Sequence, residues 1–304
     1  MRRRWMPAML LVTVLLLVGV VACAETVTVR DFSADSDSTW IDLGETRLKM
    51  AELTELLDQF PKLENCDMFA TPVTKGNIEM LTERYPEVTF GWTIRIGDHL
   101  VRTDQTAFST LHESNEEVIH HSADFEVLKY CRELKALDLG HNGITDIRFL
   151  YDLPELRVLI LACNRVTDLT PIASLKNLEY LELFTNRIKD VTPLKGLNRL
   201  MDLNLGYNAV EDYSPLYFLH NLERLWIGKA SVYAPKKILT DAAMDELTRA
   251  LPNAKISRPS TPTGNGWRKT SHFDVIRTMF AKGEYIPFED SMDAFIMEDE
   301  DEAW

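Results

Sequence analysis

The 304-residue sequence predicts an α/β solenoid: a horseshoe with a parallel concave β-sheet, helix-containing N-terminal repeats and short 3₁₀ or irregular convex segments. Two internal periods predict this architecture. Four consecutive blocks of 22 residues align without a gap from residue 131, and two earlier units of 25 residues align at 40–64 and 65–89. Periods of this length are typical of solenoids, in which each unit buries its apolar face only against its neighbours.

The 22-residue blocks share one pattern, L-x-x-L-x-L-x-x-N-x-I-x-x-I-x-x-L. In the first block its residues are Leu134, Leu137, Leu139, Asn142, Ile144, Ile147 and Leu150. The L-x-L part predicts a short strand whose leucines point into the core, while the residues between them point outward. A fifth block begins in register at Leu222 and then loses its asparagine.

Polar residues recur at the same spacing of 22. The asparagines (Asn142, Asn164, Asn186, Asn208) should turn the chain off each strand and bond to backbone groups that the turn leaves open. The aspartates (Asp146, Asp168, Asp190, Asp212) and the prolines (Pro171, Pro193, Pro215) predict turns and short 3₁₀ segments on the convex side. We interpret both series as structural.

Residues 131–218 resemble the 22-residue leucine-rich repeats of bacterial internalin-like proteins. The match extends to the N-x-I-x-D-x-x-P-L register, which residues 186–194 reproduce. The resemblance implies a leucine-rich-repeat fold. It does not imply a particular ligand, because such repeats bind many different molecules.

The chain divides into five parts. Residues 1–24 form a predicted signal peptide, and 25–107 hold the longer repeats, with helices near 50–59 and 76–84 and a β-hairpin at 92–103. These longer repeats should form the N-terminal part of the same solenoid, giving roughly eight strands and a sheet about 40 Å long. Residues 108–230 carry the 22-residue repeats, with a degenerate one at 108–130. A helical cap follows at 231–256, and a linker, a short helix near 273–280 and an acidic tail make up 257–304.

The N-terminus predicts export. Three arginines precede an apolar run from Ala8 to Val21, which is too short for a membrane span, and the small residues 22–24 follow. Cleavage after Ala24 would release a secreted protein. The alternative is acylation of Cys23, since Val20 to Cys23 resembles a lipobox, and this would give a lipoprotein on the bacterial cell surface.

Three cysteines then remain, an odd number that excludes a complete disulfide framework. Cys66 and Cys163 fall on apolar repeat positions, so we expect both to be small buried residues.

The composition and motifs give no sign of catalysis. A net charge of −14 lacks the basic footprint of a nucleic-acid-binding protein, and the motifs of zinc proteases, serine hydrolases and P-loop proteins are missing from the sequence. Glu116/His120 and Glu117/His121 could share a metal if 112–121 were helical, but we expect a solvated loop there. We therefore predict no enzyme activity, no cofactor and no metal.

The outward-facing strand positions define the predicted binding surface. Aromatic and apolar side chains cluster there across neighbouring repeats, which is costly for a solvent-exposed face unless it is used. The predicted ligand-binding residues are Val158, Ile160, Tyr180, Glu182, Phe184, Tyr207, Arg224 and Trp226. The alternative is that the C-terminal tail or a second copy of the chain covers this strip.

The sequence thus predicts a secreted or surface-bound binding protein that recognises a protein, or alternatively a glycan, on its concave face. A second hypothesis is a structural spacer of the cell envelope anchored through Cys23, and a metal-dependent activity at 112–121 is the third. Contact with a membrane is expected only through a lipidated Cys23, and the sequence leaves the oligomeric state open.

Overall fold

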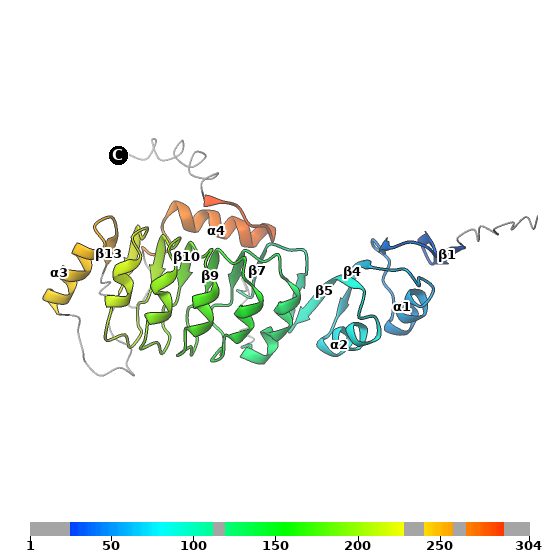
Figure 1. Ribbon diagram of the computed structural model, residues 1–304, viewed down its shortest axis with the longest axis horizontal. Helices are drawn as coiled ribbons and strands as arrows, with labels where there is room; N and C mark the ends of the chain where they lie inside the picture. Colours follow the sequence, from blue (N-terminus) through cyan, green and yellow to red (C-terminus); the bar gives the residue numbers. More distant parts are fainter. Residues whose placement is uncertain (1–24, 112–118, 228–239, 258–265, 289–304) are drawn as a thin grey trace, which may run out of the picture.

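The computed structural model describes residues 25–111, 119–227, 240–257 and 266–288. The predicted signal peptide with Cys23, most of the 112–121 stretch and the acidic tail therefore lie outside the described residues. The described residues form three sheets: a two-stranded one, a four-stranded one, and a seven-stranded parallel one that forms the body of the molecule (Figure 1). The predicted leucine-rich-repeat solenoid is confirmed.

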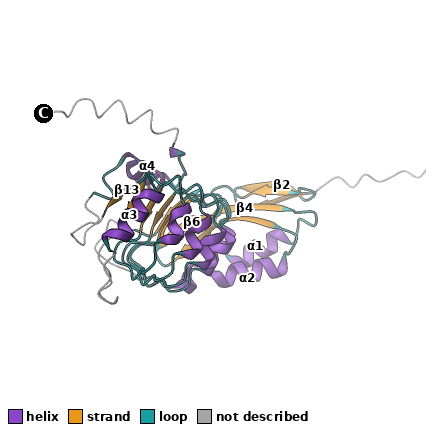
Figure 2. Ribbon diagram, turned by 60° about the vertical axis from the view of Figure 1, so that its left-hand side comes forward, coloured by secondary structure: helices purple, strands orange, loops and turns teal. Residues whose placement is uncertain are grey.

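The N-terminal region contains a hairpin and a small mixed sheet backed by two helices. Strands β1 (Thr26–Val29) and β2 (Phe32–Asp35) pair antiparallel. The four-stranded sheet has the order β3 (Trp40–Asp42), β4 (Asn65–Val73), β5 (Thr89–Ile96) and β6 (His99–Arg102). Helices α1 (Met50–Leu57) and α2 (Lys75–Arg84) lie on one face of this sheet (Figure 2). Both helices predicted from the 25-residue units are thus confirmed.

The seven-stranded sheet is built from three-residue strands, one for each repeat. In spatial order they are β7 (Ala107–Ser109), β8 (Ala136–Asp138), β9 (Val158–Ile160), β10 (Tyr180–Glu182), β11 (Asp202–Asn204), β12 (Arg224–Trp226) and β13 (Lys255–Ser257). Residues 22 apart are register partners, as in Tyr180 with Val158 and Asp202. The convex side consists of the predicted 3₁₀ segments η1 (Ser122–Tyr130), η2 (Arg148–Asp152), η3 (Thr170–Ser174), η4 (Thr192–Gly196) and η5 (Ser214–Phe218).

One prediction about the sheet is wrong: the longer N-terminal repeats do not extend it. Strands β3 to β5 form a separate sheet, so the repeat sheet has seven strands and begins at β7. The predicted hairpin is the physical reason, because β6 folds back antiparallel on β5 and takes the hydrogen-bonding edge that β7 would otherwise use. The apolar core nevertheless continues through both regions, from Val27 to Leu251.

The asparagine series binds neighbouring repeats to one another. Asn186 donates from Nδ2 to the carbonyl oxygens of Leu161 (2.8 Å) and Leu183 (3.1 Å), and its Oδ1 accepts from the Val166 N–H (2.9 Å). Asn164 and Asn208 repeat these contacts one block earlier and one block later. The predicted backbone-bonding role is confirmed.

The aspartate series starts the 3₁₀ segments. In each of four repeats a carboxylate oxygen accepts from the backbone N–H two residues later, as Asp190 does from Thr192 at 2.8 Å. A proline then follows in the first turn of η3, η4 and η5, where no backbone donor is required.

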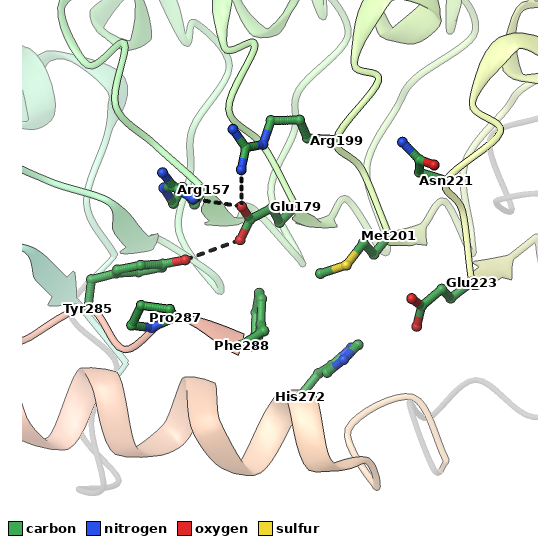
Figure 3. Close-up of a pocket in the computed structure, with 10 residues that line it drawn as sticks. All are labelled: Arg157, Glu179, Arg199, Met201, Asn221, Glu223, His272, Tyr285, Pro287 and Phe288. Carbon is green, nitrogen blue, oxygen red and sulfur yellow. Dashed lines mark hydrogen bonds and ion pairs between the residues drawn. The ribbon is translucent and has the colours of Figure 1, made fainter. Parts of the chain in front are cut away.

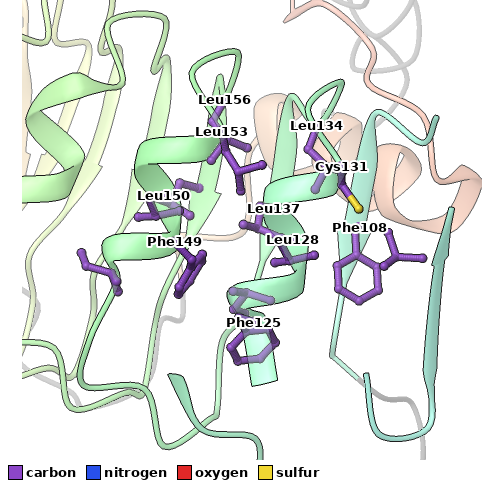
Figure 4. Close-up of a cluster of buried hydrophobic side chains, with 14 of the residues drawn as sticks. Phe108, Phe125, Leu128, Cys131, Leu134, Leu137, Phe149, Leu150, Leu153 and Leu156 are labelled. Atoms are coloured by element: carbon purple, nitrogen blue, oxygen red, sulfur yellow. The ribbon is translucent and has the colours of Figure 1, made fainter. Parts of the chain in front are cut away.

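The core lies between the strands and the 3₁₀ segments, where apolar side chains of successive repeats stack (Figure 4). The inward leucine of each repeat strand, such as Leu159 or Leu181, is fully buried. Cys66 and Cys131 are also buried, but Cys163 is only half-buried, contrary to its prediction. Cys163 precedes the turn asparagine with a left-handed backbone (φ 56°), so its side chain leaves the core.

The helix that the sequence analysis predicted for the cap region is present. Helix α3 (Asp241–Ala250) begins at Thr240, whose hydroxyl accepts from the Ala243 N–H at 3.2 Å. Strand β13, which the sequence analysis missed, pairs with β12 and completes the sheet. A last helix, α4 (Ser271–Lys282), then crosses back over the strands β7 to β10 (Figure 1).

Candidate protein-binding face

The candidate site is the face of the seven-stranded sheet that points away from the 3₁₀ segments, called here the concave face. Its side chains come from the first and third residue of each strand, because successive residues of a strand point to opposite sides. The structure brings the outward residues of β9 to β12 together, as the sequence predicted.

The concave face is covered by residues 266–288, called here the C-terminal segment. Val275, Ile276 and Met279 of α4 are buried in a second apolar cluster that contains Ala107, Ala136, Val158 and Ile160 of the sheet. Trp267 is completely buried, and its ring packs against Tyr180 and Trp226 with centroids 5.5 and 5.7 Å apart. Of the two alternatives for the aromatic strip, the structure shows the one in which the C-terminal part of the chain covers it.

Glu182 of β10 is the first polar residue of the sheet that binds the segment. This carboxylate is 3 % exposed and accepts from Trp267 Nε1 at 3.0 Å and from Arg268 Nη2 at 3.0 Å. The Tyr180 hydroxyl donates to it at 3.0 Å. Burial is the main cause that raises the pKa of Tyr180 well above its usual value, so this hydroxyl stays a donor.

Asp202 of β11 is the second such residue. It is fully buried, and it accepts from Arg224 of the next strand and contacts His272 Nδ1 of α4 at 2.6 Å. The hydrogen bond with Asp202 raises the pKa of His272. Arg224 also places its guanidinium 4.3 Å from the centre of the Trp267 ring, so Glu182 and Asp202 are connected.

A third carboxylate, Asp138 on β8, lies buried on the same face. Its Oδ1 accepts from the Gly140 N–H at 2.9 Å. Burial raises the pKa of Asp138 to about 6, and the positive charge of Arg268 opposes the shift. The covered face is therefore acidic, and the segment brings positive charge to it.

The predicted ligand-binding residues fall into two groups. Val158, Ile160, Tyr180 and Glu182 lie under the C-terminal segment and are at most 3 % exposed, so they cannot contact a second molecule while the segment is in place. The other four are half-buried at the margin of the covered area: Phe184, Tyr207, Arg224 and Trp226.

An open groove of about 600 Å³ remains beside the segment, at the edge where the strands begin (Figure 3). Its walls are the residues that precede β9 to β12 on one side and the C-terminal segment on the other. They are Arg157, Glu179, Arg199, Met201, Asn221, Glu223, His272, Tyr285, Pro287 and Phe288.

Glu179 organises one end of this groove. Its carboxylate accepts from Arg157 (2.8 Å), Arg199 (3.4 Å) and the Tyr285 hydroxyl (3.1 Å). Sequence reasoning missed these residues because it considered the outward positions within and after each strand, and not the position directly before it. The signal was present, since this repeat position recurs every 22 residues and is occupied in turn by Arg157, Glu179, Met201 and Glu223.

The proposed metal pairs of 112–121 cannot be placed, because residues 112–118 lie outside the described part of the chain. His120 is buried, with its backbone N–H donating to Asn142 Oδ1 at 2.9 Å. Within the described ranges, no group of three or more His, Cys, Asp or Glu side chains could hold a metal ion. The helices of those ranges also lack the length and apolar composition needed to cross a bilayer.

Comparison with known proteins identifies the repeats. The family model described as "Leucine Rich repeats (2 copies)" matches residues 132–174 and 154–196. These residues are leucine-rich repeats. No curated protein matches the chain.

Solved structures with similar folds include two internalins of Listeria monocytogenes. Internalin F is 23 % identical with a TM-score of 0.38, over 68 % of this chain and 52 % of that one. Internalin C2 is 23 % identical with a TM-score of 0.37, over 59 % and 84 %. A leucine-rich-repeat protein of Leptospira interrogans is 22 % identical with a TM-score of 0.43, over 67 % and 50 %. The chain thus spans about half the length of the first and third of these proteins.

Proposed function

We propose that this chain is a non-enzymatic binding protein, secreted or held on the bacterial cell surface, that binds a protein ligand on its concave face. The observation that supports the proposal best is the groove beside the C-terminal segment. It is lined by the same position of four successive repeats and remains open although the rest of the face is covered.

The chemistry of the groove suits a protein surface. Met201 and Pro287 provide apolar contact area, while Phe288 is a buried part of the wall, and arginines and glutamates surround them. Protein interfaces combine an apolar centre with a polar rim, and methionine and arginine are common in them. Met201 is half-buried and flexible, so it can adapt to the shape of a partner.

The charged groups of the groove favour binding over catalysis. Glu179 is 11 % exposed at its side chain, and two arginines and a tyrosine hydroxyl already occupy its oxygens. A carboxylate held in this way orders the two arginines for contact with a ligand.

The test uses the full chain as bait against secreted and surface proteins from its environment, with captured proteins identified by mass spectrometry. A Met201→Glu variant puts a charge in the middle of the groove and should weaken capture at least tenfold, which corresponds to about 1.4 kcal/mol. Tyr151→Glu is the matched control, because Tyr151 lies on η2 of the convex side and is 51 % exposed.

The proposal fails if no protein is captured, or if Met201→Glu captures as well as the control. Glycans are tested in parallel on immobilised oligosaccharides. Binding there, lost in Met201→Glu and without any protein captured, would change the ligand class to carbohydrate.

A further inference from the structure

The C-terminal segment contacts the concave face as a bound peptide would. Three of its residues are polar or aromatic anchors: Trp267, Arg268 and His272. Four face the sheet at helical spacing, His272, Val275, Ile276 and Met279, which puts them on one side of α4. Residues 258–265 separate the segment from β13 in the sequence. Besides these side-chain contacts, the Gly283 carbonyl of the segment accepts from the Ala107 N–H of β7 at 3.2 Å.

The charges of the two surfaces are complementary. The covered face contains three buried carboxylates, Asp138, Glu182 and Asp202. Arg224, which bonds to Asp202, is a basic residue of the sheet itself. The segment 266–288 has four Lys or Arg residues (268, 269, 277, 282) and two acidic ones (274, 284), a net charge of 4 − 2 = +2 in a chain of net charge −14. Unpaired buried carboxylates are costly, so the face requires a cationic occupant.

The fit is nevertheless incomplete. Asn204 Nδ2 and Arg224 Nη2 are buried on this face without a hydrogen-bond partner among the described residues. Asn204 is 1 % exposed and lies between Glu182 and Trp226 in the register of the sheet. An unsatisfied buried donor weakens an interface. An occupant that offered an acceptor at this point would therefore bind more tightly than the segment does.

We propose that residues 266–288 are an intramolecular ligand, and that the partner of the concave face is a cationic amphipathic helix of another protein that displaces them. This inference rests on the proposed function and specifies its ligand. The partner carries an aromatic residue and an arginine for Glu182, apolar residues at helical spacing for Val158 and Ile160, and a hydrogen-bond acceptor for Asn204. Its displacement of the segment exposes the four predicted contact residues that are now covered.

Covalent connection makes the segment a strong competitor. A tether of eight residues holds a binding segment at an effective concentration of about 1 mM, so a free peptide of the same sequence binds the full chain only weakly. Weakening the attached segment should remove this competition and improve the apparent affinity for a free one.

The experiment measures binding of a fluorescent synthetic peptide, residues 264–288 of this chain, to the full-length protein by anisotropy. The double variant Trp267→Ala/Arg268→Ala loosens the attached segment and leaves the concave face intact. It should bind the peptide at least tenfold more tightly than the wild type. Arg277→Ala is the control, because its side chain is 73 % exposed, and it should behave like the wild type. Adding Asp202→Asn to the double variant should reduce binding again. Equal binding by wild type and double variant would overturn the proposal.

Hydrogen exchange of the wild type gives a second measurement that does not depend on a variant folding. The amides of α4 should exchange faster than those of β9 and β10, because the segment opens while the solenoid stays folded. Exchange of α4 at the same rate as the strands would make the segment a permanent part of the fold and refute the proposal. Light scattering measures the oligomeric state and so tests whether a second copy of this chain is the occupant. A wild-type dimer that dissociates in Trp267→Ala would assign the face to that second copy and overturn the proposal.

These results are distinguishable from a failure of the proposed function. Peptide binding and hydrogen exchange need no natural partner, so they test only whether the segment is exchangeable. The capture experiment changes Met201, which belongs to the sheet side of the groove and keeps its place whether or not the segment moves.

Discussion

Replacing Asn186 by alanine tests the idea that the asparagine series joins the repeats. The side chain is 3 % exposed and makes three hydrogen bonds to backbone groups. Two of its partners are shared: the Leu161 carbonyl also accepts from Asn164 at 3.2 Å, and the Leu183 carbonyl from Asn208 at 2.8 Å. The Val166 N–H, by contrast, has Asn186 as its partner, so Asn186→Ala leaves this buried donor unsatisfied.

The expected loss follows from these contacts. A buried donor without a partner costs about 1–3 kcal/mol, and each of the two weakened carbonyl contacts adds about 0.5 kcal/mol. We therefore expect Asn186→Ala to lower the free energy of unfolding by about 2–4 kcal/mol. Asp190→Ala is the matched control in the same repeat. Its carboxylate is exposed and accepts hydrogen bonds only from the backbone N–H and the side chain of Thr192, so the loss should be about 1 kcal/mol.

Urea denaturation followed by far-UV circular dichroism measures both values. The loss for Asn186→Ala should exceed that for Asp190→Ala by at least about 1 kcal/mol, with little change in the slope against urea concentration. Equal losses for the two variants would refute the reasoning, because they would mean that the buried asparagine contributes no more than an exposed turn residue.

Three further predictions concern single side chains. Gly91→Ala should destabilise by about 1–3 kcal/mol in the same assay, because an added Cβ would clash with the Asp67 carboxylate and the Phe69 ring. Gly76→Ala, with open space around it, should be neutral or stabilising. Because burial raises the pKa of Asp138 to about 6, above the ~3.9 of an unfolded chain, the folded state holds this proton more tightly. The free energy of unfolding should therefore fall as the pH rises from about 4 to about 6, and Asp138→Asn should flatten this part of the profile; a parallel profile for the variant would contradict the assignment. Cys163 should react with iodoacetamide in the native protein before Cys66, whose thiol is buried with its pKa raised to about 12, as peptide mass spectrometry would show.

Most of the repeat architecture could be predicted because its causes are local. The leucines at spacing 22 identify the inward positions of each strand, and the asparagine and aspartate bond to backbone groups within a few residues or in the next block. The extent of the sheet was not predictable in this way. It depends on whether β6 or β7 takes the free edge of β5, and the hairpin decides this in favour of β6.

The candidate site could be predicted in position but not in accessibility. Alternation along the strand places Tyr180 and Ile160 on the outer face, and the structure agrees. Trp267, whose ring packs against Tyr180, is 85 positions from its partner Glu182, and no short-range pattern connects the two. Trp267 and Arg268 belong to no repeat pattern, so the sequence did not indicate that Glu182 is their partner.

The sequence by itself thus determined the repeat, the faces of its strands and the apolar character of the outer strip, because these follow from periodicity and from contacts between neighbouring blocks. The tertiary structure alone decided what covers that strip. Apolar side chains such as Val158 are stabilised equally by any complementary surface, whether from another protein or from the same chain. The connection through residues 258–265 holds α4 close to the sheet, and this proximity gives the chain's own segment the advantage.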